Sequence, residues 1–540
     1  MAFLSPLTLF FAGVTFAEQL STPPVHRPLV QVPDKASAGA GVPLQPFVSY
    51  SIEFSSFPDF AGNLSHPNTF SNNLLDNLAS YTGIKPLIRV GGNTQDFAVF
   101  NKSLNSAIVG IVDPAKSPDY PTTITIGPAY LESYMTWPDT KFIHGFDLGR
   151  NSTVARQSLL DSVPFACKAL GDGRLAYWEL GNEPDLFKRA FVRPPNWNEE
   201  DYVMEWLTWT RKIREVMKAA CPDLATKETY QYYAPSFAGT DGNGLDPVIA
   251  WEAGLDRDKD IALISSHNYI SGANVLGVTL QGTLMNHTST VQSIAKQLNS
   301  SQYLAALPDD LQPNLPFILG ETNSLYNQGR PGLSNTFGAA LWVVDFNLWC
   351  AANEIRRVHM HQGTNYRYQS WQPVDTNITS KGTKAPYYGN IAVAAFLGDL
   401  TSVDRLPRIV NLPLPSEKEA AYASYAQGKL SKLIVINMEE YNATSGNEFL
   451  NDYERPIEQY TFQLPHGYQG RYDVQRLSAN GSDAITGVTF DGKSYNYELD
   501  NGLPVKQTNV TTGEMVQVER MGHLRLAVPR SSAAIVVFCD

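Results

Sequence analysis

Glu183 has a sequence context that is typical of a catalytic carboxylate and unlike that of a core residue. The segment 176–185 runs through apolar and aromatic residues up to Gly181 and then places Asn182 and Glu183 directly before Pro184. Proline disfavours the α conformation in the residue before it and lacks a backbone donor. The sequence therefore predicts a buried strand that ends here and presents Glu183 at an edge.

A second glutamate follows the same design much further along the chain. In the segment 316–323 a short apolar run leads to a glycine and then to Glu321. Two carboxyl groups about 5–5.5 Å apart can hydrolyse a glycosidic bond with retention of configuration, one attacking the anomeric carbon and the other protonating the leaving oxygen. The acid needs a pKa raised by burial and a nearby negative charge, whereas hydrogen bonds and cations keep the nucleophile ionised.

The elements between these glutamates alternate between strand-like and helix-like segments. Eight short apolar or β-branched runs occur at residues 47–54, 86–90, 141–148, 176–180, 229–234, 261–265, 317–319 and 358–360. Stretches with helical spacing of apolar residues lie between most of them, at 69–81, 154–170, 200–221, 289–304 and 335–352. This order is typical of an α/β (β/α)8 TIM barrel, whose chemistry sits at the carboxyl ends of the strands. We assign the barrel to residues 46–380.

An open doubly wound sheet is the alternative architecture. No glycine-rich phosphate loop follows a strand, and residues 90–93 lack both the glycine spacing and the later acidic partner of a dinucleotide site. Within the barrel, Glu179 shares a strand face with Glu183 because side chains alternate with period two. We interpret Glu179 as a structural residue in a lower layer, since it lies inside the apolar run.

The pattern changes beyond residue 381. Alternating runs separated by Gly, Asn, Asp and Pro turns predict an all-β sandwich domain over residues 381–540. The segment 18–45 carries its own short apolar run, and we expect it to add a strand to that domain.

Polar groups follow nearly every predicted barrel strand, and a barrel would bring them together. They are Glu53, Arg89, Asn93, Asp147, Arg150, Asn182, Glu183, His267, Tyr269, Glu321, His361, Asn365 and Tyr366. A buried Arg–Glu pair can simply hold strands together, and a single histidine is more often structural. The histidines show no metal-ligand spacing, so we expect no metal and no cofactor.

Composition and charge narrow the partners. The 540-residue chain has a formal net charge of −12 and no long basic run, which argues against nucleic acid. Residues 1–17 read as a signal peptide, and no later apolar run is long enough for a spanning helix, so we expect a secreted protein without a membrane partner.

Cysteines and glycosylation sequons fit an extracellular chain. Four cysteines could form two disulfides by any of three pairings, and their spacing fits no zinc site. The cysteines are Cys167, Cys221, Cys350 and Cys539. Nine Asn-X-Ser/Thr sequons predict surface positions, at Asn63, Asn101, Asn151, Asn286, Asn299, Asn377, Asn442, Asn480 and Asn509.

Three motifs in order carry a resemblance to a known family. The segments 178–184 (WELGNEP), 319–324 (LGETNS) and 88–93 (IRVGGN), joined by 335–339 and 363–366, resemble glycoside hydrolase family 79, the β-glucuronidase and heparanase family. The resemblance implies Glu183 as acid/base, Glu321 as nucleophile and Asn182 as partner of the sugar 2-hydroxyl. It also implies that Tyr269 donates to the nucleophile.

The same resemblance implies how a uronate would be recognised. Tyrosine hydroxyls and backbone N–H groups can bind a carboxylate without a full positive charge beside the nucleophile. The matching residues are Tyr326, Gln328, Gly329 and Tyr366, although this turn is less glycine-rich than in the family. Glu53, Arg89 and His267 complete the expected substrate-binding set.

The resemblance leaves a choice of activity. We favour a retaining exo-β-glucuronidase acting on terminal glucuronic or 4-O-methylglucuronic acid. A heparanase-like endo-enzyme would need clustered basic residues and an excisable insert after the first strand, and this acidic chain has neither. A non-catalytic carbohydrate-binding protein on the same fold is the other alternative. The sequence leaves the oligomeric state open.

Overall fold

The central element is a closed barrel of eight parallel strands, which confirms the predicted fold class. The computed structural model describes residues 25–240, 242–445, 449–450 and 453–539, so the predicted signal peptide 1–17 lies outside the described residues. The barrel strands are β2 (Val48–Glu53), β3 (Ile88–Gly91), β7 (Phe142–Phe146), β8 (Leu175–Leu180), β9 (Tyr232–Phe237), β10 (Ile261–Gly272), β11 (Phe317–Tyr326) and β12 (Val358–Gln362).

Helices surround the barrel, and most begin at a side chain that caps them. They include α1 (Phe57–Ala61), α2 (Thr69–Thr82), α3 (Pro128–Leu131), α4 (Thr153–Ala169), α5 (Glu199–Ala220), α6 (Pro247–Glu252), α7 (His287–Ala305), α8 (Phe337–Ala352) and α9 (Ala385–Leu397). Asn68, Ser152, Asn198, Asn286 and Thr336 accept hydrogen bonds from backbone N–H groups of the first turn. Such caps satisfy donors that the helix itself leaves unpaired. The local sequence thus fixes where these five helices start.

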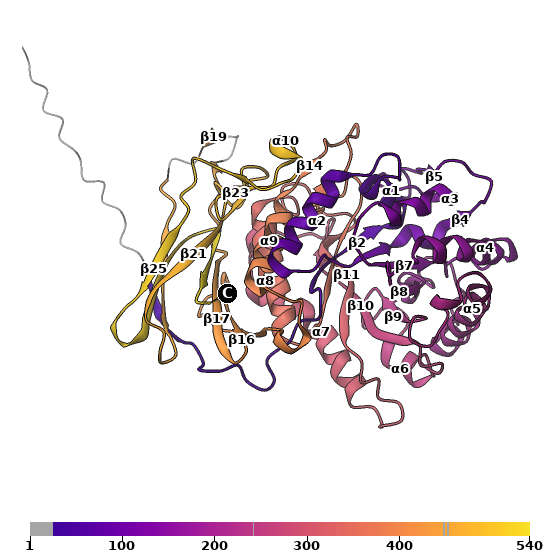
Figure 1. Ribbon diagram of the computed structural model, residues 1–540, viewed down its shortest axis with the longest axis horizontal. Coiled ribbons are helices and arrows are strands. Elements are labelled where there is room, and N and C mark those ends of the chain that lie inside the picture. The colour runs from indigo at the N-terminus through magenta and orange to yellow at the C-terminus, as the bar shows by residue number, and fades with distance from the viewer. Residues whose placement is uncertain (1–24, 241, 446–448, 451–452, 540) are drawn as a thin grey trace, which may run out of the picture.

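Helix α9 corrects the expectation that the chain is all-β from residue 381. Every residue of α9 is buried, and it lies with α8 between the barrel and the large sheet (Figure 1). A helix that is covered on all sides needs no polar face, so it lacks the amphipathic period by which helices are recognised. The predicted division at 380/381 therefore falls before the last barrel helix.

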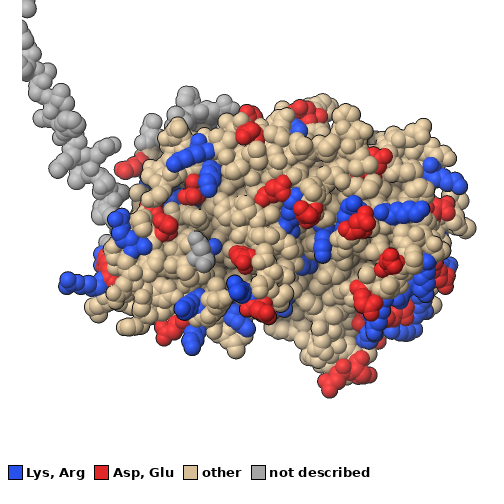
Figure 2. Space-filling model, viewed as in Figure 1, with Lys and Arg blue, Asp and Glu red and all other residues tan. Residues whose placement is uncertain are grey.

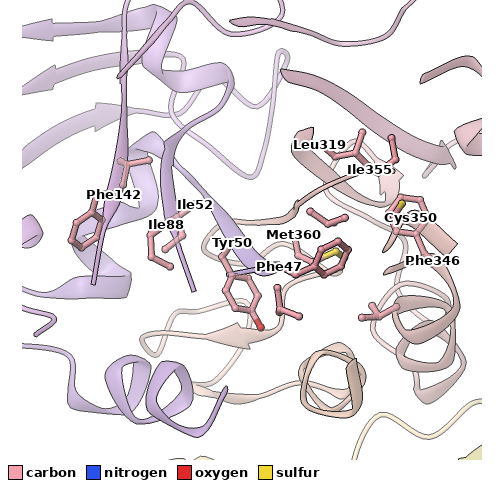
Figure 3. Close-up of a cluster of buried hydrophobic side chains, with 14 of the residues drawn as sticks. Phe47, Tyr50, Ile52, Ile88, Phe142, Leu319, Phe346, Cys350, Ile355 and Met360 are labelled. Carbon is pink, nitrogen blue, oxygen red and sulfur yellow. The ribbon is translucent and has the colours of Figure 1, made fainter. Parts of the chain in front are cut away.

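The barrel core joins strands to these central helices. Tyr50, Ile52 and Ile88 from the barrel strands lie on one side of the view in Figure 3, and Phe346 and Cys350 of α8 lie on the other. All five side chains are fully buried. This continuous apolar core packs the barrel strands against the helices and so holds the strand ends in place.

The second domain is a 12-stranded sheet that curls around its own core (Figure 1). Its strands are β1 (Val25–Gln31), β15 (Arg408–Asn411), β16 (Glu419–Ala426), β17 (Lys429–Asn437), β20 (Ile457–Gln463), β21 (Gly470–Ser478), β22 (Thr489–Phe490), β23 (Lys493–Ser494), β24 (Val505–Lys506), β25 (Glu514–Val518), β26 (His523–Pro529) and β27 (Ser532–Val537). β1 pairs in parallel with β20. Along β16, Tyr422 packs toward the barrel helices, whereas Ala421 and Ala423 enter the second core. Both faces of this strand are covered, which explains the apolar run over residues 420–423.

A short insertion projects from the barrel between β3 and β7. It forms a three-stranded sheet from β4 (Ala98–Phe100), β5 (Ile108–Ile111) and β6 (Thr123–Ile126). Because it leaves the carboxyl end of β3 and returns before β7, it stands beside the strand ends that carry the predicted site.

Cysteines and sequons differ in part from expectation. Cys167 and Cys221 form a disulfide that joins the ends of α4 and α5, whereas Cys350 is buried and Cys539 exposed, both as free thiols. Of the two disulfides that four cysteines could form, the described residues contain one. Asn286 is also buried, because its side chain caps α7.

No helix among the described residues is long and apolar enough to cross a membrane.

Candidate active site

Glu183 lies just beyond β8 in an unusual backbone conformation. Its φ of 50° is in the left-handed region, which few non-glycine residues adopt. Pro184 opens the 3-10 turn η4 (Pro184–Leu186), and the Glu183 N–H donates to the Ser236 carbonyl of β9 at 3.0 Å. The left-handed backbone at Glu183 avoids the right-handed helical conformation, which a following proline disfavours. It also directs the Glu183 side chain over the mouth of the barrel.

Glu321 is buried inside β11 and does not end it. β11 continues to Tyr326, and β10 likewise extends through His267 and Tyr269 to Gly272. These two strands are longer than the sequence indicated. Their extra length places His267, Tyr269 and Glu321 on neighbouring strands with paired registers.

The two glutamates face each other across the barrel mouth. One carboxylate oxygen of Glu183, one of Glu321 and a ring nitrogen of His267 all lie within 4.8 Å of one another. This spacing is close to the roughly 5–5.5 Å that separates the carboxyl groups of retaining glycosidases, and shorter than inverting enzymes need.

Glu321 is held in its ionised form. Arg89 donates from Nη1 to Glu321 Oε2 at 2.6 Å, and the Tyr269 hydroxyl donates to Oε1 at 2.8 Å. His361 Nδ1 lies 3.6 Å from Oε2. Burial alone would raise the pKa of Glu321, but the charges of His361 and Arg89 and the hydrogen bond from Tyr269 together hold it well below its usual range.

Glu183 has the opposite electrostatic environment. Burial and the negative charge of Glu321 raise its pKa to about 8, although Arg89 and His361 act against the shift. Its closest partner is His267, whose Nδ1 lies 2.9 Å from Glu183 Oε1. Burial lowers the pKa of His267 to about 4, so the imidazole is neutral and supplies no counter-charge near neutral pH.

Arg89 connects the layers beneath the carboxylates. It is fully buried and donates from Nε and Nη2 to Glu179, each at 2.9 Å, in addition to Glu321. Nη2 also donates to Asn182 Oδ1 at 2.8 Å. Glu179 therefore lies below the reacting pair as a counter-ion of Arg89, and Arg89 fixes both Asn182 and Glu321.

Asp96 positions the same region from the side. Its carboxylate accepts from the backbone N–H of Leu148 at 2.7 Å, of Gly149 at 3.0 Å and of Asn182 at 2.8 Å. The loops after β3, β7 and β8 are thereby tied to one buried side chain. Sequence reasoning missed Asp96, because nothing in its local sequence shows which backbone groups it binds.

A metal fits this arrangement poorly. Glu183, His267 and Glu321 offer three ligand atoms close together. However, His267 Nδ1 is already in hydrogen-bonding contact with Glu183, and its Nε2 is buried without a partner among the described residues. Metal-binding histidines almost always hydrogen-bond through the second nitrogen. The set suits proton transfer better than coordination.

A cavity of about 770 Å³ opens above the two glutamates. Of the predicted substrate-binding residues, Glu53, Asn182, Tyr269, Tyr326 and Gln328 line it. Arg89 and His267 lie beneath, in contact with the carboxylates. The cavity is large enough for a sugar and part of its leaving group.

Besides Arg89 and His267, two further predicted residues do not line the cavity. The Gly329 N–H donates to the Leu325 carbonyl at 3.0 Å, so this amide is not available to a ligand. The Tyr366 hydroxyl is buried and donates to Glu53 Oε2 at 3.1 Å. Tyr368, which sequence reasoning did not single out, lines the cavity instead and packs near Tyr269.

The lining divides into two walls. Glu53, Asn93, Tyr326, Asn327, Gln328, His361 and Tyr368 come from elements on the side of β11, β12, β2 and β3. Leu186, Arg189, Ala238, Gly239, Thr240, Asn243, Gln292 and Ser293 come from the loops after β8 and β9 and from α7. We call the first set the glycone wall, because it adjoins Glu321, and the second the leaving-group wall, because it adjoins Glu183.

Comparisons with known proteins agree with this geometry. The sequence profile of the glycosyl hydrolase family 79 C-terminal beta domain matches residues 421–535. A β-glucuronidase of Aspergillus niger is 55% identical, covering 98% of this chain and 99% of that protein. A β-glucuronidase of Neurospora crassa is 52% identical, covering 94% and 96%.

Solved structures share the fold. A 4-O-α-L-rhamnosyl-β-D-glucuronidase from Fusarium oxysporum superposes with a TM-score of 0.74 at 22% identity, covering 94% of this chain and 100% of that one. A family 51 α-L-arabinofuranosidase from Bifidobacterium longum gives 0.59 at 13% identity, covering 94% and 99%. Fold, carboxylate pair and relatives together define a barrel glycoside hydrolase. The chain is similar over nearly its full length to the two fungal β-glucuronidases, and its C-terminal region matches the family 79 domain. It therefore belongs to glycosyl hydrolase family 79.

Proposed function

We propose that the protein is a retaining exo-β-glucuronidase that removes terminal β-linked glucuronic or 4-O-methylglucuronic acid. The observation that carries the proposal is the pairing of an ionised Glu321 with a protonated Glu183 at less than 5 Å in one cavity. Its full-length fungal relatives are β-glucuronidases by name, which supports the choice of sugar.

The first chemical step uses the two carboxyl groups in different forms. Glu321 attacks the anomeric carbon while Glu183 transfers its proton to the glycosidic oxygen, so the leaving group departs neutral and a glycosyl ester forms on Glu321. Loss of that proton leaves Glu183 ionised. Glu183 then takes a proton from water, which attacks the anomeric carbon and releases Glu321.

Neighbouring side chains hold the reacting groups. Tyr269 and Arg89 bind the two oxygens of Glu321, which keeps the carboxylate oriented for attack. Asn182 accepts a hydrogen bond from Arg89 through its side-chain Oδ1, and its backbone N–H donates to Asp96. Its side-chain nitrogen Nδ2 is thereby left to bind the sugar 2-hydroxyl. Hydrogen bonds to this hydroxyl strengthen in the transition state.

The carboxylate of the sugar has donors on the glycone wall. Tyr326 is 45% exposed and lines the cavity next to Asn327 and Gln328. These two residues have φ values of 62° and 61°, and their backbone N–H groups have no acceptor among the described residues. A uronate carboxylate placed here would accept from neutral donors, consistent with an ionised Glu321 close by.

Charge distribution favours a terminal uronate over a polyanionic chain. The lining cations Arg189 and Lys296 are outnumbered by the carboxylates Glu53, Glu183 and Glu321. Arg189 also already donates to the Gly242 carbonyl. Figure 2 shows Lys, Arg, Asp and Glu interspersed on one face of the molecule, without a continuous basic track there.

Secretion and glycosylation belong to the same proposal. The Cys167–Cys221 disulfide is expected of a protein that matures in an oxidising compartment. Eight of the nine sequon asparagines are exposed or partly exposed. N-terminal sequencing of the protein from the culture medium should find the first residue near Glu18, and an N-terminus at Met1 would contradict the signal peptide.

Release of a chromophore from an aryl β-D-glucuronide tests the function. The aryl β-D-glucoside and β-D-xyloside serve as controls, and we expect cleavage of the glucuronide well above both. Proton NMR of the first product should show the β-anomer, as retention requires. Preference for the glucoside would reject the uronate specificity, and no cleavage of any substrate would favour a binding protein.

A further inference from the structure

Asp119 and Arg367 form a two-pronged ion pair that the mechanism above does not use. Arg367 donates from Nη1 to Asp119 Oδ1 at 2.6 Å and from Nη2 to Oδ2 at 2.9 Å. The Arg367 side chain is only 24% exposed and the Asp119 side chain 8%. This parallel geometry is directional as well as strong. Asp119 belongs to the insertion between β3 and β7, and Arg367 to the loop after β12, so the pair joins two distant parts of the chain.

Arg367 also holds the turn that follows β11. Its backbone N–H donates to the Gln328 carbonyl at 2.8 Å, and its Nε donates to the Gly329 carbonyl at 3.2 Å. Asn327, Gln328 and Gly329 all have positive φ values of 61–78°. Left-handed non-glycine residues cost of order 1–3 kcal/mol each and persist only where the surroundings hold them. Arg367 supplies such contacts to two of the three residues.

Asp119 fixes the opposite end of the glycone wall. The next residue, Tyr120, accepts a hydrogen bond through its hydroxyl from Asn93 Nδ2 at 3.3 Å, and Asn93 lines the cavity. Burial raises the pKa of Tyr120, and the charges of Glu53 and Glu183 raise it further. The insertion thus stands behind the sugar site.

We propose that the Asp119–Arg367 pair sets the specificity of the sugar site by holding the 327–329 turn against the insertion. This inference rests on the proposed glucuronidase function. Neither side chain lines the cavity, so both are positioning residues. Asp119 also neutralises Arg367, so the guanidinium orders the turn without adding a free positive charge.

Loss of the pair should act on uronates and spare other sugars. Without the Arg367 side chain the turn keeps the backbone hydrogen bond from residue 367 to the Gln328 carbonyl but loses the contact at Gly329 and the tie to Asp119. The N–H groups of Asn327 and Gln328 are then held less firmly, and binding of the sugar carboxylate weakens. A glucoside has no carboxylate and loses nothing at this point. Glu183 and Glu321 keep their own contacts, which do not involve Arg367, so the effect should fall on KM more than on kcat.

The test compares Arg367→Met and Arg367→Lys with wild type on aryl β-D-glucuronide and aryl β-D-glucoside. For Arg367→Met we expect the ratio of the two kcat/KM values to fall at least tenfold, through a higher KM for the glucuronide. Competitive inhibition by free D-glucuronate should weaken by a similar factor. Arg367→Lys should lie between, because an ammonium lacks the planar fork that grips Asp119 and Gly329 together.

A matched control exists on the surface. Arg211 makes the same two-pronged contact with Asp258, at 2.7 and 2.8 Å, but on the exposed side of α5. Arg211→Met should leave the ratio unchanged. Thermal unfolding of each variant shows whether it is folded.

Two results would overturn the inference. One is a folded Arg367→Met enzyme whose ratio stays within twofold of wild type, and the other is an equal loss on both substrates in either folded variant. A wild type that cleaves no aryl glucuronide would contradict the proposed function itself. A wild type that cleaves it, with variants that show no change, would contradict only the role of the Asp119–Arg367 pair.

Discussion

Glu183 and Glu321 are the same residue type at the same end of one barrel, the first mostly buried and the second buried, yet they differ in charge. Burial would raise the pKa of each. Glu321 escapes because Arg89 and Tyr269 bind its oxygens and His361 lies nearby. Among the described residues the Glu183 carboxyl group has only the neutral His267 as a hydrogen-bond partner, so burial and the charge of Glu321 raise its pKa to about 8. The neighbours, not the residue type, decide which carboxyl group attacks and which one donates.

The largest predicted effect separates the two roles. Glu321→Gln should lower kcat on an aryl glucuronide by roughly 10⁴–10⁶-fold, the scale seen when a nucleophile is removed. Glu183→Gln should lose roughly 10²–10⁴-fold, as for removal of a general acid. Steady-state kinetics measure both.

The chemistry of rescue makes this distinction sharper. Azide needs no general base, so it should restore part of the turnover of Glu183→Gln on substrates with acidic leaving groups and give a β-glycosyl azide. Glu321→Gln should give no β-azide. Glu354→Gln, on the exposed surface, is the control and should behave as wild type. Equal behaviour of the two active-site variants would abolish the proposed difference in roles.

A smaller effect is expected at Tyr269. Tyr269→Phe removes one hydrogen bond from the ionised Glu321 and leaves Arg89 in place. Hydrogen bonds to charged groups contribute about 1.5–3 kcal/mol, which corresponds to roughly a 10- to 100-fold loss in kcat/KM. The acid limb of the pH–rate profile should also move to higher pH, because the ionised form of Glu321 loses a hydrogen-bond donor and the pKa of Glu321 rises. An unchanged acid limb would show that Tyr269 does not tune the nucleophile.

The smallest effect is expected at His267. Burial is the main cause of the raised pKa of Glu183, and His267 is neutral, so His267→Gln should cost only a few-fold in kcat/KM. Activity should still fall as the pH rises through about 8, because the acid then loses its proton. A basic limb displaced by a full unit would mean that His267 controls this proton.

The barrel and the carboxylate pair could be predicted from the sequence because both have local signatures. An apolar run that stops at a glycine before Glu183, and the similar run before Glu321, are visible without coordinates. Helix α9 had no such signature, since burial on all sides removes its polar face. Tyr368 and Asp119 were missed for another reason: their partners are distant in sequence, and only the folded chain brings them together.

Carbon-13 NMR of glutamate carboxyl groups tests the central claim most directly. Signals of Glu183 and Glu321 can be assigned in protein labelled at glutamate by their loss in Glu183→Gln and Glu321→Gln. We expect Glu183 to titrate near pH 8 and Glu321 to stay ionised throughout the range in which the protein is folded. In Glu321→Gln the pKa of Glu183 should fall, because a neighbouring negative charge is gone. Titration of both groups near the ordinary glutamate pKa of about 4.3 would contradict the account, as would a pKa of Glu321 above that of Glu183.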